Sequence, residues 1–212
     1  MPGLRERKKQ ETRQLLADTA RRLFAECGFE QVSVAEIARE ANVSEATVFN
    51  YFPTKEDLVY GRLEAFEDEL LGAIRDREPG ESVLAAFGRF VLQARGFLAA
   101  GDEDAASSLL EISRMIASSP ALLARERRIL ADYTDSLARL IAEDTGAAPD
   151  DPKPRVVATA LIGVHRALID FVRERILAGD RDLKRLARDT RGHGEEALAL
   201  LARGLDDYGT KR

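Results

Sequence analysis

Residues 33–55 read SVAEIAREANVSEATVFNYFPTK, and this stretch decides the fold. Ser33, followed three residues later by Glu36, is a capping-box pattern that begins a short helix. Asn42 stands at a tight turn, because Asn tolerates left-handed backbone better than most residues. Ser44 then caps a second short helix, which ends before a proline. A short helix, a three-residue turn and a second capped helix form a helix-turn-helix.

The second of these helices has two different faces. Val48 and Phe52 are four residues apart and form an apolar pair that we expect to be buried. The opposite face carries small or polar side chains: Glu45, Ala46, Thr47 and Asn50. Such a helix fits a major groove about 12 Å wide and reads base edges from its N-terminal half.

The stretch resembles the TetR family of repressors over roughly residues 7–65. The family pattern is a Ser- or Thr-capped helix, I-A-x-x-A, a G-V-S turn, and then T-[LV]-Y-x-[YH]-F with a Lys shortly after. Asn42 replaces the Gly of that turn. This chain matches it at Ser33, Ile37-Ala38-x-x-Ala41, Val43-Ser44, Thr47-Val48-Phe49-x-Tyr51-Phe52 and Lys55. The rest of the chain agrees with the family in length, helix number and apolar character.

The resemblance implies a set of DNA contacts. Tyr51 and Lys55 would contact phosphates. Base or phosphate contacts would come from Ser44, Glu45, Thr47, Phe49 and Asn50. Asn50 is suited to a bidentate pair with adenine, although a phosphate contact is an equal alternative. Phe49 replaces the usual Tyr, so a phosphate contact is lost while a thymine methyl contact stays available. The expected set is Ser33, Ser44, Glu45, Ala46, Thr47, Phe49, Asn50, Tyr51 and Lys55.

Charge is distributed unevenly along the chain. The net charge is −5, but residues 1–55 carry nine Lys and Arg against eight acids, a net of +1. Five basic residues lie in the first thirteen: Arg5, Arg7, Lys8, Lys9 and Arg13. A basic arm on an acidic body suits a protein that touches DNA at one end. A solvated tail is an equally good interpretation, so DNA contact by residues 1–13 stays open.

Helical periodicity continues through the rest of the chain, without strand-like alternation or internal repeats. The pattern predicts an all-α protein of about nine helices: 4–27, 34–41, 45–52, 55–77, 81–100, 103–118, 120–145, 154–178 and 182–205. Gly192 and Gly194 lie inside the last of these and could break it. We expect a DNA-binding domain of three helices over 1–54 and a larger ligand-binding and dimerisation domain over 55–212.

The predicted helix 154–178 is apolar around most of its circumference, which indicates burial on several sides. One of its stripes consists of small residues that allow close approach of another helix. A partner subunit is therefore expected, and the resemblance implies a four-helix bundle across a two-fold axis. The expected interface comprises Val156, Ala160, Gly163, Ala167, Phe171, Leu198, Leu201 and Leu205.

The region 81–145 is expected to hold a small-molecule effector. Polar groups within apolar stripes and nearby aromatic rings are the candidate contacts: Phe87, Phe90, Glu111, Arg114, Met115, Tyr133 and His165. Ordinary structural roles remain open for four of them, and Tyr133 also suits a core position with its hydroxyl group hydrogen-bonded. Glu111 and Arg114 also suit an exposed i, i+3 ion pair, and His165 an interface hydrogen bond. Helix 55–77 is expected to carry the effector signal, with Leu70 and Leu71 packed in the body.

Other classes of function are disfavoured by the sequence. Two His and one Cys cannot build a common metal site, and neither a catalytic motif nor a phosphate loop is present. We therefore predict neither an enzyme nor a cofactor. The absence of a signal-like N-terminus or a long apolar run predicts a cytoplasmic location without membrane insertion.

The sequence thus predicts a homodimeric repressor of a nearby operon. It would bind a palindromic DNA operator and be released by an unidentified small-molecule effector. A ligand-independent regulator, or an activator with the same DNA-binding mode, is the alternative.

Overall fold

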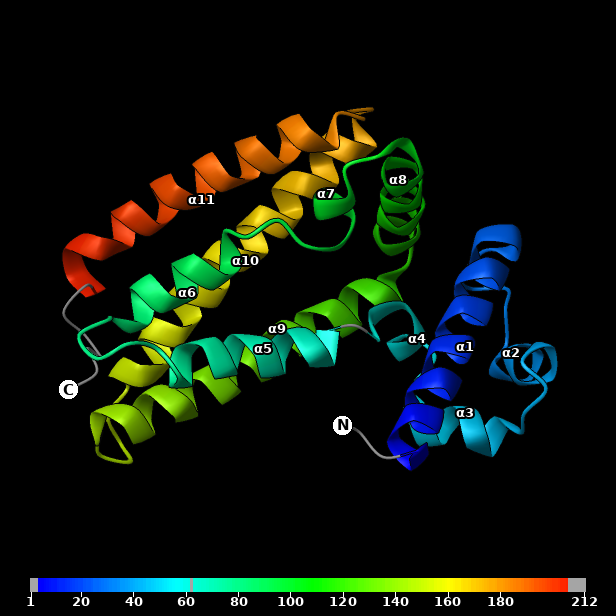
Figure 1. Ribbon diagram of the computed structural model, residues 1–212, viewed down its shortest axis with the longest axis horizontal. Helices are drawn as coiled ribbons and strands as arrows, with labels where there is room; N and C mark the ends of the chain where they lie inside the picture. Colours follow the sequence, from blue (N-terminus) through cyan, green and yellow to red (C-terminus); the bar gives the residue numbers. More distant parts are fainter. Residues whose placement is uncertain (1–3, 62, 206–212) are drawn as a thin grey trace. The chain divides into compact units, whose positions relative to one another are not determined.

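The computed structural model describes the backbone of residues 4–61 and 63–205, and the side chains of residues 7–61, 66–202 and 204. These residues form eleven α-helices and no strand, which confirms the all-α prediction. The helices are α1 Leu4–Cys27, α2 Val34–Glu40, α3 Glu45–Tyr51, α4 Asp57–Tyr60, α5 Leu63–Arg75, α6 Val83–Val91, α7 Gly96–Ala100, α8 Glu103–Ser118, α9 Pro120–Thr145, α10 Lys153–Leu177 and α11 Leu183–Leu205 (Figure 1).

The chain forms two compact units. The first contains Met1–Leu63 and Met115–Glu126, and the second contains Glu64–Arg114 and Arg127–Arg212. Helices α1 to α4 therefore lie in the first unit, together with the end of α8 and the start of α9. The second unit holds α5, α6, α7, α10 and α11 with the remainder of α8 and α9.

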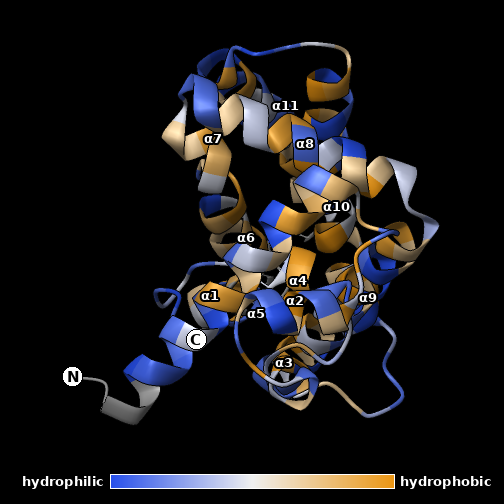
Figure 2. Cartoon of the chain, turned by 90° about the vertical axis from the view of Figure 1, so that its right-hand side faces the viewer, coloured by the Kyte–Doolittle hydropathy of each residue, from blue (hydrophilic) through white to orange (hydrophobic). Residues whose placement is uncertain are grey.

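The first unit is built around α1, against which α2 and α4 pack, while α3 packs on α2. Hydrophilic residues dominate the N-terminal turns of α1 (Figure 2), whereas Leu16 and Ala20 further along are fully buried. Phe24 and Phe29 complete this core with an edge-to-face contact at 5.0 Å between ring centroids. The helix-turn-helix is thus seated on a long helix with an apolar stripe, which fixes its orientation within the unit.

In the second unit, α10 and α11 run side by side in opposite directions (Figure 1). Leu161 of α10 and Leu186 of α11 are fully buried. Arg77, which follows α5, is also buried, at 2 % exposure. It donates to the carbonyl oxygens of Ile74 at 2.8 Å and Glu81 at 3.0 Å and pairs with Asp144 of α9. The guanidinium therefore fastens the α5–α6 turn to the C-terminal half of α9.

Two predicted helices were wrong in extent, because each is interrupted. The segment 55–77 divides into α4 and α5 near Gly61, whose carbonyl accepts a hydrogen bond from Arg13. The segment 81–100 divides into α6 and α7 before Gly96, which has a φ of 54°. The last helix, in contrast, runs without a break through Gly192 and Gly194.

Candidate DNA-binding interface

The first helix of the motif begins with the predicted capping box. The backbone N–H of Ser33 donates to Glu36 Oε2 at 2.7 Å, and the N–H of Glu36 donates to Ser33 Oγ at 3.2 Å. These bonds from the backbone and hydroxyl of Ser33 hold the pKa of the Glu36 carboxyl below its usual value. The Ser33 hydroxyl is therefore engaged in starting α2.

The turn between the two helices depends on Asn42. Its φ is 54°, the only positive value among the described residues other than glycine, and this confirms the role predicted from the sequence. The next backbone N–H, that of Val43, donates to the carbonyl of Ala38 at 2.9 Å. The left-handed residue thus reverses the chain and allows α3 to begin immediately afterwards.

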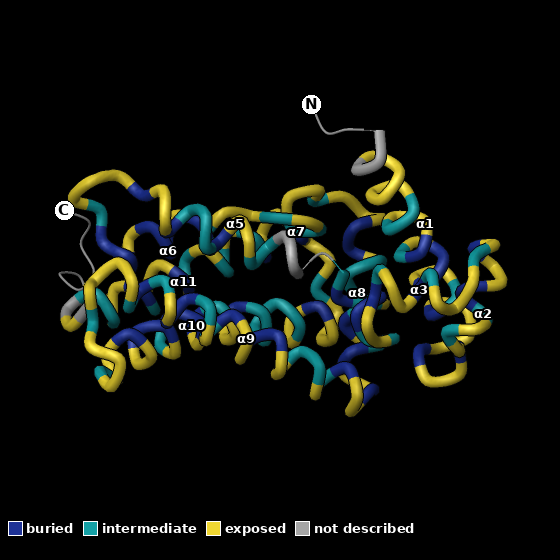
Figure 3. Tube along the Cα trace, turned by 90° about the horizontal axis from the view of Figure 1, so that it is seen from below, coloured by how far each residue is buried: buried dark blue, intermediate teal, exposed yellow. Residues whose placement is uncertain are grey.

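The second helix, α3, starts at the Ser44 cap. Ser44 Oγ accepts from the Thr47 N–H at 3.1 Å and lies 2.8 Å from the Thr47 hydroxyl. Val48 is buried at 1 % exposure, as is Phe52 just after the helix, so the predicted underside is confirmed. Exposed and buried segments alternate through α2 and α3 (Figure 3).

The opposite face of α3 is open to solvent. Its exposed residues are Glu45, Ala46, Phe49 and Asn50, whose spacing places them on adjacent turns of one side. The Phe49 ring is 47 % exposed, so it is accessible to a binding partner. An exposed ring beside an amide and a carboxylate offers apolar and hydrogen-bonding contacts together, as base edges require.

Tyr51 and Lys55, the expected phosphate contacts, lie at the end of this surface. Both are half-buried. Lys55 Nζ lies 4.2 Å from the centroid of the Phe29 ring, which orients the ammonium group by a cation–π contact. The Tyr51 carbonyl accepts a hydrogen bond from Arg13 at 3.0 Å, which ties the end of α3 to α1.

Arg13 has a structural role that the sequence reasoning missed. Besides its bonds to the carbonyls of Tyr51 and Gly61, its guanidinium lies 4.6 Å from the centroid of the Phe52 ring. Its charge places Arg13 with the basic arm, but it lies three residues before the buried Leu16 on the same face of α1. Of that arm, Arg7, Lys8 and Lys9 are exposed, and the Arg5 side chain lies outside the described residues.

Within the first unit, the start of α9 is fastened to α4. Thr54 and Asp57 form a capping box, with Thr54 Oγ1 donating to Asp57 Oδ2 at 2.8 Å. Arg125 donates to the other oxygen of Asp57 at 2.7 Å. The Tyr60 hydroxyl donates to the Leu122 carbonyl at 3.1 Å. The Arg125 and Tyr60 contacts join residues more than sixty positions apart, so local sequence patterns do not predict them.

The candidate effector residues fall into different places. Phe90, Tyr133 and the half-buried His165 meet in the second unit around Phe66, and Phe87 of α6 is fully buried in the same unit. Burial lowers the pKa of His165 to about 4.

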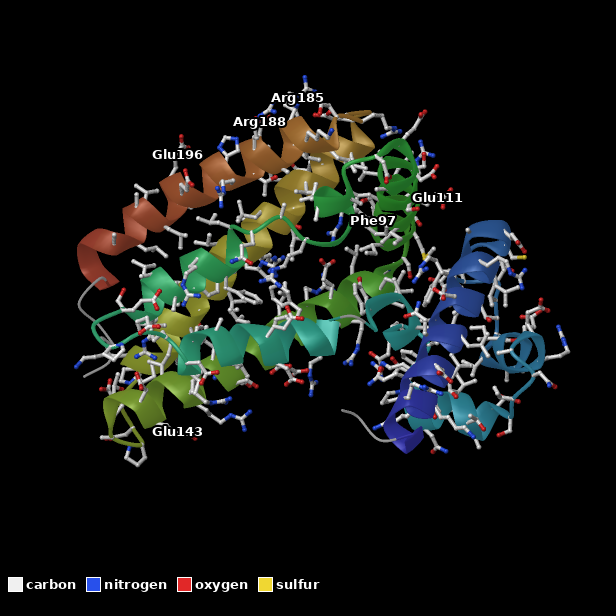
Figure 4. All side chains as sticks on the ribbon, in the orientation of Figure 1. Phe97, Glu111, Glu143, Arg185, Arg188 and Glu196 are labelled. Carbon is white, nitrogen blue, oxygen red and sulfur yellow. The ribbon has the colours of Figure 1, made fainter. Side chains whose placement is uncertain are left out.

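The other effector candidates lie apart from these rings. Glu111 and Arg114 are exposed on α8, and they do not form the i, i+3 ion pair that was the alternative. Figure 4 shows Glu111 pointing outward from α8. Met115 belongs to the first unit.

The candidate interface residues also differ in exposure. On α10, Gly163 and Ala167 are exposed, Val156 is 62 % exposed, and Ala160 is half-buried. Phe171 packs within its own unit, with its ring 4.8 Å from that of His193. Leu198 is buried at 9 % exposure, Leu201 is half-buried, and the Leu205 side chain lies outside the described residues.

No helix in the described part of the chain is both long and apolar enough to span a membrane. Within the same residues, His, Cys, Asp and Glu form no group of three suited to a metal ion.

Comparison with known proteins identifies this arrangement as a DNA-binding transcriptional regulator. Residues 16–60 match the model of bacterial regulatory proteins of the tetR family, and residues 83–206 match that of the MftR C-terminal domain. The chain belongs to the TetR family of transcriptional regulators. The resemblance seen in the sequence is therefore confirmed.

Two relatives show the extent of the similarity. The chain is 31% identical over 189 residues to the HTH-type transcriptional regulator TcmR of Streptomyces glaucescens, covering 88% of this chain and 82% of TcmR. It is 28% identical over 165 residues to the putative mycofactocin biosynthesis transcriptional regulator MftR of Mycobacterium tuberculosis, covering 74% and 78%.

Solved structures share the fold. NalD, the secondary repressor of the MexAB-OprM multidrug efflux pump in Pseudomonas aeruginosa, aligns with a TM-score of 0.54 at 21% identity, covering 93% of this chain and 98% of NalD. The SmeT–triclosan complex aligns with a TM-score of 0.53 at 18% identity and 94% coverage of both chains.

Proposed function

We propose that the protein is a homodimeric repressor that binds a palindromic operator and leaves it when a small molecule binds the second unit. The observation that carries this proposal is the exposed face of α3, where Glu45, Phe49 and Asn50 project from a helix anchored on its other side. In the bound state α3 lies in the major groove, and Lys55 and Tyr51 contact flanking phosphates. Ser33, Ser44, Ala46 and Thr47 complete the proposed contact set.

The second copy is proposed to pack on α10 and α11. The α10 stripe of Val156, Gly163 and Ala167 is apolar, small and exposed, as a close helix contact across a two-fold axis requires. In this proposal Phe171, Leu198 and Leu201 support the interface from within their own protomer. Two protomers would present their α3 helices to successive major grooves about 34 Å apart.

The outer face of α11 is complementary to itself. Arg185 and Arg188 lie on one side of Gly192, and Glu196 lies on the other, and all three charged side chains point outward (Figure 4). Arg188 and Glu196 are each four residues from Gly192, about 6 Å along the axis. If two α11 helices cross in opposite directions at Gly192, each Arg188 meets the Glu196 of the other copy. A Cβ at Gly192 would meet no described atom within 4 Å, so the crossing is sterically open.

Charge reversal tests this dimer. R188E is expected to raise the dissociation constant of the dimer about tenfold or more, and E196R to do the same, since each places like charges together. The double variant R188E/E196R is expected to recover dimerisation. R128E on the exposed part of α9 is the matched control, and sedimentation velocity is the measurement. Equal dimerisation of all four variants would contradict the proposed crossing.

The effector signal is proposed to pass through α9. This helix is continuous from Pro120 to Thr145, and its start is held to α4 by Arg125–Asp57 and by Tyr60–Leu122. The effector must bind the DNA-incompetent arrangement of the dimer more tightly than the competent one. The predicted helix 55–77 does not transmit the signal as one rigid helix, because the structure divides it into α4 and α5 near Gly61.

Selection of DNA from a random pool by the purified protein tests the function as a whole. Enrichment of an inverted repeat is expected, and N50A is expected to relax the preference at one position in each half-site. A chromosomal deletion then separates the alternatives: transcription of the adjacent operon rises for a repressor and falls for an activator. Failure to enrich any duplex at low salt would refute the proposal.

A further inference from the structure

Four rings from four helices meet in the second unit. Phe66 of α5 stacks on His165 of α10, with 4.7 Å between centroids and 13° between planes. It stacks also on Tyr133 of α9, at 5.8 Å and 25°. Phe90 of α6 meets the Phe66 ring edge-on at 5.3 Å. Phe66 is therefore the central member of an aromatic cluster, and two of its neighbours offer flat faces parallel to it.

A half-buried cationic side chain, that of Arg95, borders this cluster. The Arg95 guanidinium lies 3.8 Å from the centroid of the Phe90 ring, and its Nη1 pairs with Glu69 at 2.7 Å. Its Nη2 donates to Gln93 Oε1 at 3.3 Å. Its Nε is buried and finds no acceptor among the described residues. Because buried N–H groups are almost always satisfied, this Nε marks a place where an acceptor is missing.

The rest of the cluster is uncharged and hydrogen-bond competent. Burial keeps the pKa of His165 near 4, so the imidazole is neutral at pH 7. Neither of its nitrogens has a hydrogen-bond partner in the described chain, which leaves one donor and one acceptor available. The site thus combines flat aromatic faces, one cationic donor and a neutral imidazole.

We propose that the effector is a planar aromatic molecule with one oxyanion or carbonyl oxygen, which stacks on His165 and Tyr133 in place of Phe66 and accepts a hydrogen bond from Arg95 Nε. The inference rests on the proposed function, because it names the ligand class of the effector site. Phe66 lies one turn from the start of α5, the helix that follows α4 in the chain. The ligand would contact Tyr133 of α9, the helix proposed above to carry the effector signal.

Calorimetry with 2-naphthoate, a planar aromatic carboxylate, tests the ligand class on the full-length protein without DNA. Decanoate supplies the same carboxylate on a flexible aliphatic chain, and 2-naphthamide supplies the ring with a neutral oxygen. Naphthoate is expected to bind at least tenfold more tightly than decanoate, with naphthamide between them. Absence of naphthoate binding at millimolar concentration, or equal binding of decanoate, would overturn the proposal.

Variants test the two assigned roles. R95Q is expected to weaken naphthoate binding about tenfold, while R89Q, which alters an exposed Arg paired with Glu81, changes it less than twofold. F66L is expected to bind naphthoate as tightly as the native protein or more tightly. A leucine side chain cannot stack on His165 and Tyr133, so it competes less well with the ligand for that position. F66A is the second test should F66L repack. Weaker naphthoate binding by both Phe66 variants, or an unaffected R95Q, would refute the exchange.

Operator affinity of the ligand-free protein is measured in parallel. If the operator is bound and naphthoate is not, the ligand class is wrong and the regulator function stands. If neither binds, the proposed function fails as well.

Discussion

Removal of the Arg125 side-chain charge should lower the free energy of unfolding of the protein. The Arg125–Asp57 bond is 2.7 Å long, and the two side chains are 32% and 11% exposed. Exposed ion pairs contribute up to about 1 kcal/mol, and breaking a buried pair costs about 3–5 kcal/mol. Asp57 keeps its bonds from Thr54, so R125Q should lower the free energy of unfolding by about 1–2 kcal/mol.

Calorimetric melting at a fixed protein concentration measures this loss. For a chain of this size, 1 kcal/mol corresponds to about 2–4 °C, so R125Q should melt about 2–8 °C lower. R128Q is the matched control, because Arg128 pairs with Asp132 in the same helix with both side chains largely exposed, and it should change stability by less than about 0.5 kcal/mol. If R125Q and R128Q melt at the same temperature, the Asp57 contact does not fasten α9 to α4.

Three further predictions concern other parts of the molecule. N50A should lose about 1–3 kcal/mol of discrimination at one operator position, measured by competition between operators that differ at single bases, and equal loss at every position would indicate a phosphate contact instead. G194A should destabilise the protein by about 1–3 kcal/mol in urea unfolding, because its Cβ would meet Leu92 and lie 3.2 Å from Leu168 Cδ1, whereas G72A, with no described atom within 4 Å, should be neutral or stabilising. The lowered pKa of His165, about 4 in the folded state against 6.5, means that the unfolded chain binds the proton more tightly. Stability should therefore fall from about pH 6.5 to pH 4, by up to about 3 kcal/mol, and H165Q should lack this component; an unchanged pH profile in H165Q would contradict the burial of the imidazole.

The helix-turn-helix could be predicted because its determinants are local. Its determinants are the Ser33–Glu36 capping box, the left-handed Asn42 and the Ser44 cap. Each acts on residues within one or two helical turns, so it can be predicted from the sequence. The exposed and buried faces of α3 follow from helical spacing alone.

The missed features depend on contacts between distant residues. The break near Gly61 accompanies a bond from Arg13, 48 positions away, and the buried Arg77 pairs with Asp144, 67 positions away. Gly194 does not break α11, because its missing side chain makes room for Leu92 and Leu168. Hydrophobic periodicity contains none of this information.

The candidate ligand site was only partly foreseen for the same reason. Sequence pattern indicates Phe90, Tyr133 and His165 as candidates, but it does not indicate the central Phe66 or the cationic Arg95. Four helices must fold together before these side chains become neighbours. Glu111 and Arg114 looked equally suitable by spacing, yet they point to solvent.

Sedimentation of the protein with its selected duplex tests the central claim most directly, since that claim joins a paired molecule to groove recognition by α3. The account predicts two chains on one duplex containing both half-sites, and a much weaker complex when either half-site is scrambled. It also predicts that affinity falls with salt by about 0.9 logarithmic units per phosphate contact for each tenfold rise in salt. A single chain on the duplex, or equal affinity for scrambled DNA at all salt concentrations, would contradict it.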